Sequence, residues 1–461
     1  MRKAKIFFIN GTILTITALI MKCIGMAFNL YISNKIGSEA VGIFSLVMSV
    51  YMFSITLATS GLSIACTCIV SEQFSKGNFF DALKAVKSCL IFSLLLGLGS
   101  STIILLLSNV ISQNWLNEVV SCVPIYLISV GLPFISISSV INGYFTAVRK
   151  AYKSAFSQAF ELFIKIISTI LLLNFYPNKN VESICICLIL ADVISEISSC
   201  SLLLILYRKD YAKYIKRSIK QLTFKKRIFQ IAFPISTTSY IGSGLSTLKQ
   251  FIIPSRLVLF GLSYSMALSE YGKINGMTMS VLLFPNVFIM SFSNLLIPEF
   301  ASLLAKEYKK RILEVCKKIF LATSIFSISV SIIFFLFANE ISLIVFQNLE
   351  CAKYIRILSP LILFIYPDNI LDSILKGLNK QFSVMFCNIL DLVLTITILY
   401  FLLPILGLTG YLLAIMVSEI FNFCISYFHL YKATGFKISL SITCFYLFFV
   451  CLEIYEIIRT L

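Results

Sequence analysis

The 461-residue sequence has little charge and almost no histidine or tryptophan. Only 13% of its residues are Asp, Glu, Lys or Arg, it has one His and one Trp, and 59% of it is hydrophobic. Soluble globular domains typically carry about 25% charged residues. The scarcity of charge, together with apolar runs near twenty residues, excludes a soluble domain and indicates an all-α polytopic membrane protein.

The sequence also lacks the patterns of most enzymes and metal sites. It contains no metal-ligand spacing, phosphate-binding loop or nucleophile–base pattern, so it predicts a transporter without a cofactor. Its 14 Cys lie mostly inside apolar runs, where they act as small hydrophobic residues. The net charge of +17 would suggest nucleic acid in a soluble protein. Here the basic residues occupy alternate loops, which favours anionic membrane lipids as the partner.

The apolar runs predict about thirteen spanning helices. They do not alternate apolar and polar residues, as the strands of a membrane barrel would. The run after Met1-Arg2-Lys3 has no small-residue cleavage site, so it predicts a first span and not a signal peptide. The predicted spans are about 6–33, 41–70, 82–108, 116–147, 155–175, 182–207, 228–260, 266–301, 312–337, 352–377, 383–403, 408–431 and 437–457.

Lys and Arg are concentrated in every second loop. The basic segments include Lys76/Lys84/Lys87, Arg149/Lys150/Lys153, 208–227, Lys306/Lys309/Lys310/Arg311 and Lys376/Lys380. The loops opposite them, at 108–118, 174–183, 339–350 and 404–410, hold a single Lys, Lys179. Because basic loops stay in the cytoplasm, this asymmetry predicts a cytoplasmic N-terminus, and an odd number of spans places the C-terminus outside.

The chain contains an internal repeat. Matching features recur after about half its length: Pro133/Gly143 and Pro367/Gly377, Ser38-Glu39 and Ser269-Glu270, Glu161 and Asp391, Ser195-Glu196-Ile197 and Ser418-Glu419-Ile420. Two six-helix copies share one orientation, so a pseudo-two-fold axis along the membrane normal is expected, with the functional site between the copies. We expect an N-terminal lobe at 1–207, a basic cytoplasmic linker at 208–227, a C-terminal lobe at 228–432 and an extra spanning helix at 433–461.

A few charges fall inside the predicted spans, where each costs several kcal/mol unless it faces protein or water. The cations predict a cleft that binds a phosphate or diphosphate: Lys22, Lys165, Lys249 and Lys273. The acidic residues suit a coupling proton or sodium ion: Glu161, Asp192, Glu196, Asp391 and Glu419. The alternative is structural pairing within helices, of Glu161 with Lys165 and of Asp372 with Lys376. No intrahelical partner is expected for Lys22, Lys249 or Lys273, which favours the cleft.

Several short motifs resemble a known family. They are Lys22-Cys23-Ile24-Gly25, the segment 36–44, the segment 60–65, and Ser157-Gln158-Ala159-Phe160-Glu161 followed by Lys165. With them the sequence resembles the stage V sporulation protein B-like, lipid II-type flippases of the multidrug/oligosaccharidyl-lipid/polysaccharide (MOP) exporter superfamily. The resemblance implies two lobes that open alternately to either side of a bacterial plasma membrane, and cleft cations that meet a lipid diphosphate. Lys stands where these relatives often carry Arg, which keeps the charge but loses the bidentate fork.

The expected function is therefore export of an undecaprenyl-diphosphate-linked oligosaccharide or peptidoglycan precursor, in sporulation or envelope synthesis. Its partners would be that lipid-linked saccharide and envelope-synthesis enzymes at the basic linker. The main alternative is a drug/cation antiporter of the same fold. A membrane glycosyltransferase is disfavoured because no sizeable extramembrane domain is present, and a membrane scaffold has no need of intramembrane charges.

Overall fold

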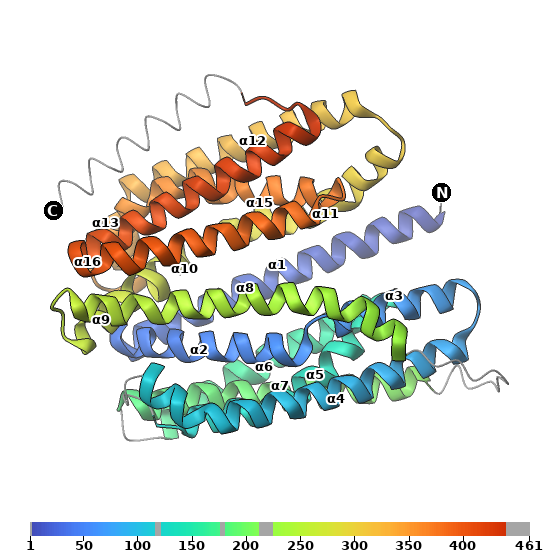
Figure 1. Cartoon of the computed structure of the whole chain (residues 1–461), viewed down its shortest axis with the longest axis horizontal. Coiled ribbons are helices and arrows are strands. Elements are labelled where there is room, and N and C mark those ends of the chain that lie inside the picture. Colours follow the sequence, from blue (N-terminus) through green and yellow to red (C-terminus); the bar gives the residue numbers. More distant parts are fainter. Residues whose placement is uncertain (1, 116–120, 176–179, 212–224, 439–461) are drawn as a thin grey trace. The chain divides into compact units, whose positions relative to one another are not determined.

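A computed structural model describes residues 2–115, 121–175, 180–211 and 225–438, and these residues are helical except for short connections. The α-helices, drawn in Figure 1, are α1 (Arg2–Ile36), α2 (Ser38–Thr59), α3 (Leu62–Ser75), α4 (Phe79–Val110), α5 (Val123–Ala147), α6 (Ala151–Phe175), α7 (Val181–Tyr211), α8 (Lys225–Leu259), α9 (Tyr264–Tyr271), α10 (Met279–Leu282), α11 (Asn286–Ala305), α12 (Lys309–Leu336), α13 (Ala338–Phe346), α14 (Ala352–Leu358), α15 (Ile362–Gly377) and α16 (Gln381–Thr434). Two π-helical segments, Ile111–Trp115 and Gly272–Thr278, and one 3₁₀ turn, Ser359–Leu361, join them.

Within the described residues, eight helices are long and apolar enough to cross a membrane, and a bent pair adds a ninth. The 54-residue α16 contains a break at Gly407 (φ 57°, ψ −130°), where the predicted spans 383–403 and 408–431 meet. The helices α1 and α8 cover the predicted spans 6–33 and 228–260. The last predicted span, 437–457, falls almost wholly outside the described residues. The all-α polytopic class is confirmed, whereas the count of thirteen stays a prediction.

Three predicted spans are interrupted, the span 352–377 only by the 3₁₀ turn Ser359–Leu361. The span 41–70 is divided at Gly61, whose φ of 75° suits glycine and whose Cβ, if present, would lie 2.5 Å from the carbonyl oxygen of Ala232. The span 266–301 is bent by 60° between 264–282 and 286–293, at Pro285. These are the second spans of the two copies, so the second span is interrupted in both, by a left-handed glycine in one and at a proline in the other.

The helices form two compact units, each described by itself. The first comprises 1–21 and 46–247, and the second comprises 22–45 and 248–461. In the first, α5 packs against α3, α4 and α7, and α7 also packs against α6. In the second, α15 packs against α11, α12 and α16. Both central helices therefore bury most of their surface in protein, which leaves their neighbours to face lipid.

The repeat is visible in the local structure of the two units. A Cβ on Gly143 would lie 2.6 Å from a carbonyl oxygen of α3, and one on Gly377 would lie 2.9 Å from a carbonyl oxygen of α11. Each central helix then ends in a left-handed residue, Arg149 (φ 58°) or Asn379 (φ 60°). Equivalent positions thus have the same close approach and the same turn, which supports a duplicated helical unit.

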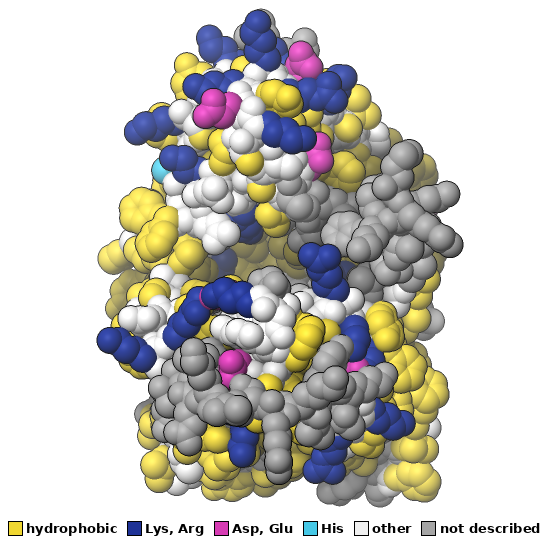
Figure 2. All heavy atoms as spheres, turned by 90° about the vertical axis from the view of Figure 1, so that its right-hand side faces the viewer, with side chains coloured by type: hydrophobic (Ala, Val, Ile, Leu, Met, Phe, Trp, Pro, Cys, Tyr) yellow, Lys and Arg dark blue, Asp and Glu magenta, His cyan; other side chains and the backbone are white. Residues whose placement is uncertain are grey.

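The basic loops of the first unit share one end. Lys150 Nζ and Lys153 Nζ, beyond α5, lie 2.7 Å and 3.2 Å from the Asp210 carboxylate near the end of α7. Arg227 at the start of α8 pairs with Glu72 near the end of α3. Figure 2 shows Lys and Arg side chains gathered on the face at which α3 turns into α4. This end has the charge that the positive-inside rule assigns to the cytoplasm.

Candidate functional site

In the first unit, a buried ion pair joins α6 and α7. Lys165 Nζ lies 2.5 Å from Asp192 Oδ1, and the Asp192 side chain is 5% exposed. The other carboxylate oxygen of Asp192 has no hydrogen-bond partner in the described part of the chain. The pair considered from sequence, Glu161 with Lys165, is not the one that forms. Asp192 is more buried than Glu161. A buried carboxylate without a cation is costly, which favours pairing of Lys165 with Asp192.

Two further carboxylates and a tyrosine surround this pair. Glu161 and Glu196 lie within electrostatic range of Asp192, and Tyr51 of α2 lies within range of all three. The Tyr51 hydroxyl is buried and has no hydrogen-bond partner among the described residues. Three carboxylates thus face one ammonium group, an excess of negative charge that can hold a proton or a small cation. The sequence indicated the carboxylates but gave no sign of Tyr51.

Serine hydroxyls fix the spacing of these helices. Ser157 Oγ of α6 lies 3.0 Å from Ser199 Oγ of α7 and donates to the Ser199 carbonyl oxygen at 3.3 Å. Both side chains are buried. Small hydroxyl residues let two helices approach closely and give the interface a polar contact. The carboxylates of α6 and α7 are therefore held at a defined distance from one another.

The second unit has a related cluster. Lys249 of α8 lies within electrostatic range of Asp391 and Glu419, which come from opposite sides of the break in α16. Ser418 Oγ donates to Asp391 Oδ1 at 2.5 Å, and Thr395 Oγ1 donates to Ser418 Oγ at 2.7 Å. Of the predicted residues in this unit, Lys249, Asp391 and Glu419 are thus brought together. The hydroxyl relay to Asp391 was not foreseen.

A second set of acidic residues lies on α15, close to this cluster. Asp372 pairs with Lys376 at 3.7 Å, as considered from sequence. Asp368 is buried, and its Oδ2 accepts a hydrogen bond from Asn422 Nδ2 of α16 at 3.0 Å. The regular spacing of Asp368, Asp372 and Lys376 was apparent in the sequence, but the contact with Asn422 depends on folding. No group of His, Cys, Asp and Glu suited to a metal ion occurs in the residues that the structure describes.

Lys273 is not an isolated cation. Its Nζ lies 2.9 Å from Glu270 Oε1 and 2.7 Å from Glu350 Oε2, and Tyr354 Oη donates to the other oxygen of Glu270. The expectation that Lys273 has no intrahelical partner is wrong, because Glu270 precedes it by three residues. Lys273 belongs to the π-helical segment Gly272–Thr278, a form often found at functional sites.

Lys22 is the least constrained of the predicted cations. It lies in the middle of α1, is exposed, and forms no ion pair with any described residue. No described contact joins it to Lys249 or Lys273, although all three belong to the second unit. Lys165 belongs to the first unit. The structure thus gives the four lysines different surroundings: one is without an ionic partner, one faces two carboxylates at longer range, and two are paired.

The helical arrangement is that of MOP superfamily transporters. A structure described as the inward-facing conformation of a multidrug resistance MATE family transporter of that superfamily superposes with a TM-score of 0.69. It shares 15% identity, and the alignment covers 92% of this chain and 99% of that one. A MOP superfamily transporter from Pyrococcus furiosus, reported to have a binding pocket of reversed polarity, superposes with a TM-score of 0.61 at 14% identity, over 91% and 95% of the two chains.

Residues 8–304 match the family of polysaccharide biosynthesis proteins, and the chain belongs to this family. It is 24% identical over 429 residues to stage V sporulation protein B of Bacillus subtilis, covering 90% of this chain and 82% of that protein. It is 20% identical over 442 residues to sporulation protein YkvU of the same organism, covering 95% and 97%. The chain is therefore a multi-pass helical protein of the polysaccharide biosynthesis family, and its fold is the one seen in MOP superfamily transporters.

Proposed function

We propose that the protein moves an undecaprenyl-diphosphate-linked oligosaccharide or peptidoglycan precursor outward across the bacterial plasma membrane, by alternating access and without covalent chemistry. Membership of the polysaccharide biosynthesis family supports a saccharide-linked substrate. The similarity to two sporulation proteins supports a role in spore or envelope assembly. In this proposal the N-terminus is cytoplasmic, and envelope-synthesis enzymes meet the linker 208–227, which lies largely outside the described residues.

The observation that carries the proposal is the position of Lys22. An ammonium group in the middle of an apolar helix, with no carboxylate of the described residues beside it, costs several kcal/mol if it faces hydrocarbon. Lys22 therefore faces water or a polar ligand during the transport cycle. A diphosphate is a ligand of matching charge, because it offers oxygen atoms that accept hydrogen bonds from ammonium groups.

We expect the two lysines that form ion pairs, Lys165 and Lys273, not to make the first contact with the substrate. Lys165 and Lys273 would each have to leave a carboxylate before they could bind a diphosphate. Lys22 and Lys249 form no ion pair shorter than 4 Å with a described residue. We therefore assign the first contact with the headgroup to Lys22 and Lys249. The carboxylate clusters of α6–α7 and of α16 would hold the coupling proton or sodium ion, since each has more acidic than basic groups.

The proposal is tested in liposomes that contain the purified protein and a fluorescent undecaprenyl-diphosphate saccharide. Lys22→Gln and Lys249→Gln should lower the translocation rate at least tenfold. Lys87→Gln, which removes an exposed lysine of α4, should leave it unchanged. Normal rates in both cleft variants would remove the basis for diphosphate recognition.

A second candidate function, the export of organic cations, is favoured by the ion pairs themselves. Two of the four predicted cleft lysines are neutralised by carboxylates, so a cationic substrate would be repelled less than by four unpaired lysines. The same liposomes distinguish the candidates: exchange of ethidium for protons without movement of the lipid-linked saccharide identifies an antiporter. Movement of the saccharide without ethidium exchange identifies the flippase.

A further inference from the structure

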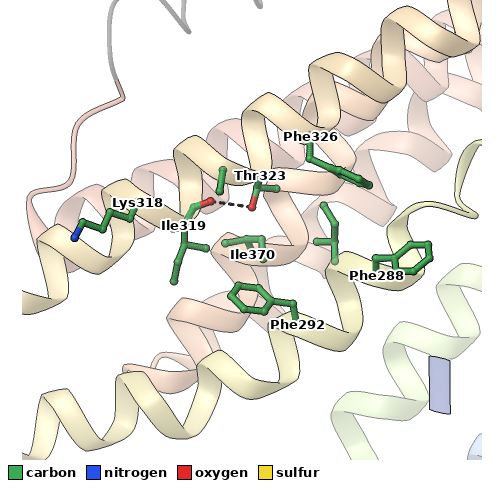
Figure 3. A pocket seen from close by; sticks show the side chains of 9 residues that line it. Phe288, Phe292, Lys318, Ile319, Thr323, Phe326 and Ile370 are labelled. Carbon is green, nitrogen blue, oxygen red and sulfur yellow. Dashed lines mark hydrogen bonds between the residues drawn. The ribbon is translucent and has the colours of Figure 1, made fainter. Parts of the chain in front are cut away.

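An apolar groove opens on the surface of the second unit between α11 and α12. Its volume is about 330 Å³, and Ile370 of α15 lies at its floor. Figure 3 shows Phe288 and Phe292 of α11 on one side and Phe326 of α12 at one end, with Lys318 at the opposite end. All three phenylalanines are substantially exposed, so the groove is open to its surroundings.

Two side chains that line the groove are polar, Thr323 and Lys318, and they differ in whether they have a partner. The Thr323 hydroxyl donates to the carbonyl oxygen of Ile319 at 2.9 Å, as the dashed line in Figure 3 shows, so it needs no other partner. Lys318 is exposed and forms no ion pair with any described residue. The groove therefore has a hydrocarbon wall along its length and one unpaired cation at one end. A matching ligand has a hydrocarbon chain and one anionic head.

The cation lies toward the basic end of α12. This helix begins with Lys309, Lys310 and Arg311, so Lys318 follows them by about two turns. In the orientation proposed above, this end of α12 is cytoplasmic. From Lys318 to Phe326 the helix rises about 12 Å, which matches the upper part of an acyl chain below its headgroup.

We infer that the groove binds one anionic phospholipid of the cytoplasmic leaflet, with an acyl chain along the phenylalanines and its phosphate at Lys318. A chain alone gives no selection, because the tails of surrounding lipids are as apolar as the groove. Selection must come from the head, and basic pockets between helices at the cytoplasmic side attract anionic headgroups. This lipid is distinct from the transported substrate, and the inference stands independently of it.

The first experiment counts bound lipid. The full-length protein is reconstituted in nanodiscs of phosphatidylcholine with 10% phosphatidylglycerol, then transferred to detergent, and retained lipids are measured by native mass spectrometry. Lys318→Gln should lower phosphatidylglycerol retention about fivefold, the value of one juxtamembrane charge. Lys317→Gln removes the adjacent lysine, which does not line the groove, and should have little effect.

A second pair of variants tests the hydrocarbon wall. Ala322→Phe places a ring inside the groove and should also reduce retention, whereas Leu321→Phe adds the same ring to an exposed neighbour that does not line it. Equal retention in Ala322→Phe and Leu321→Phe, or in Lys318→Gln and Lys317→Gln, overturns the inference.

A third measurement identifies the occupant directly. Phe292 is replaced by the photoreactive residue p-benzoylphenylalanine, and the irradiated full-length protein is digested and analysed by mass spectrometry. A cross-link enriched in phosphatidylglycerol over its share of the bilayer supports the inference. Cross-links to phosphatidylcholine in proportion to the bilayer, or to residues 439–461 of the same chain, show that the groove selects no anionic lipid and overturn it.

Discussion

Ser38 Oγ and Ser269 Oγ lie 2.7 Å apart, although 231 residues separate them in the chain. The repeat makes these two serines equivalent, because each opens a Ser-Glu pair in its own copy. Both lie in the second unit, where the start of α2 meets α9. A Cβ on Gly272 would lie 2.1 Å from the Ser38 carbonyl oxygen and 2.8 Å from the Gly42 amide nitrogen. This contact therefore depends on the absence of side chains at both glycines.

The contact makes Gly272 intolerant of even one methyl group. Gly272→Ala forces α2 and α9 apart, and overpacking of this kind costs about 1–3 kcal/mol. We expect a lower melting temperature in detergent and a lower transport rate. Gly99→Ala is the matched control, because a Cβ on Gly99 of α4 meets nothing within 4 Å. It should be neutral or slightly stabilising, since alanine favours helix over glycine. Equal melting temperatures for the two variants would contradict the proposed close packing.

The ion pair of Glu350 with Lys273 should give a small pH dependence. Glu350 follows α13 in a connection outside the spanning helices, and hydrogen bonds from Lys273 and Asn348 hold the pKa of its carboxyl below the ordinary 4.5. A carboxyl with a lowered folded-state pKa stabilises the protein above pH 4.5, and this stabilisation is lost as pH falls through the folded-state value. Because the Glu350 side chain is 55% exposed, the effect should be about 1 kcal/mol or less.

The measurement compares melting temperatures of the wild type and Glu350→Gln between pH 3 and pH 8. The difference should be constant above pH 5 and should vanish toward pH 3. Glu340→Gln, at an exposed residue of α13 without an ion pair among the described residues, should follow the wild type throughout. A difference that grows on acidification would show that Glu350 is not stabilised as a carboxylate.

Much of the fold could be predicted because the membrane imposes one rule on every segment. Backbone groups in hydrocarbon must pair within their own helix, so each long apolar run predicts a helix of matching extent, such as α4 or α12. Pro285 could be named from the sequence as a possible kink, but the break at Gly61 could not, because the apolar run continues across it. Their geometry depends on the approach of another helix, as at Gly61 and Ala232, which no local pattern shows.

The candidate site was predictable in composition but not in pairing. An ionisable residue inside an apolar run is easily recognised in a sequence. Four residues of the candidate site were found in this way: Lys165, Asp192, Asp391 and Glu419. Their partners lie on other helices: Asp192 is 27 positions from Lys165, and Asn422 is 54 positions from Asp368. Spacing along one helix therefore suggested Glu161 as the partner of Lys165. In the structure Lys165 pairs instead with Asp192, which is buried on α7.

Variants of the Lys165–Asp192 pair can distinguish an effect on stability from an effect on transport. Lys165→Met alone leaves a buried carboxylate without its cation, and breaking such a pair costs about 3–5 kcal/mol. The double variant Lys165→Met/Asp192→Leu replaces both charges by apolar groups and should recover most of this stability, because it leaves neither charge buried alone. Unfolding by titration of sodium dodecyl sulfate into detergent micelles measures both differences.

Transport then shows whether the pair is only structural. If Asp192 belongs to the coupling site with Glu161 and Glu196, the double variant should recover most of the lost stability yet lose ion-driven transport. It should keep the slow equilibration of lipid-linked saccharide that needs no ion. Full recovery of both stability and driven transport would assign Lys165 and Asp192 to holding α6 against α7. The coupling ion would then have to bind at the α16 cluster, where Asp391 and Glu419 face Lys249.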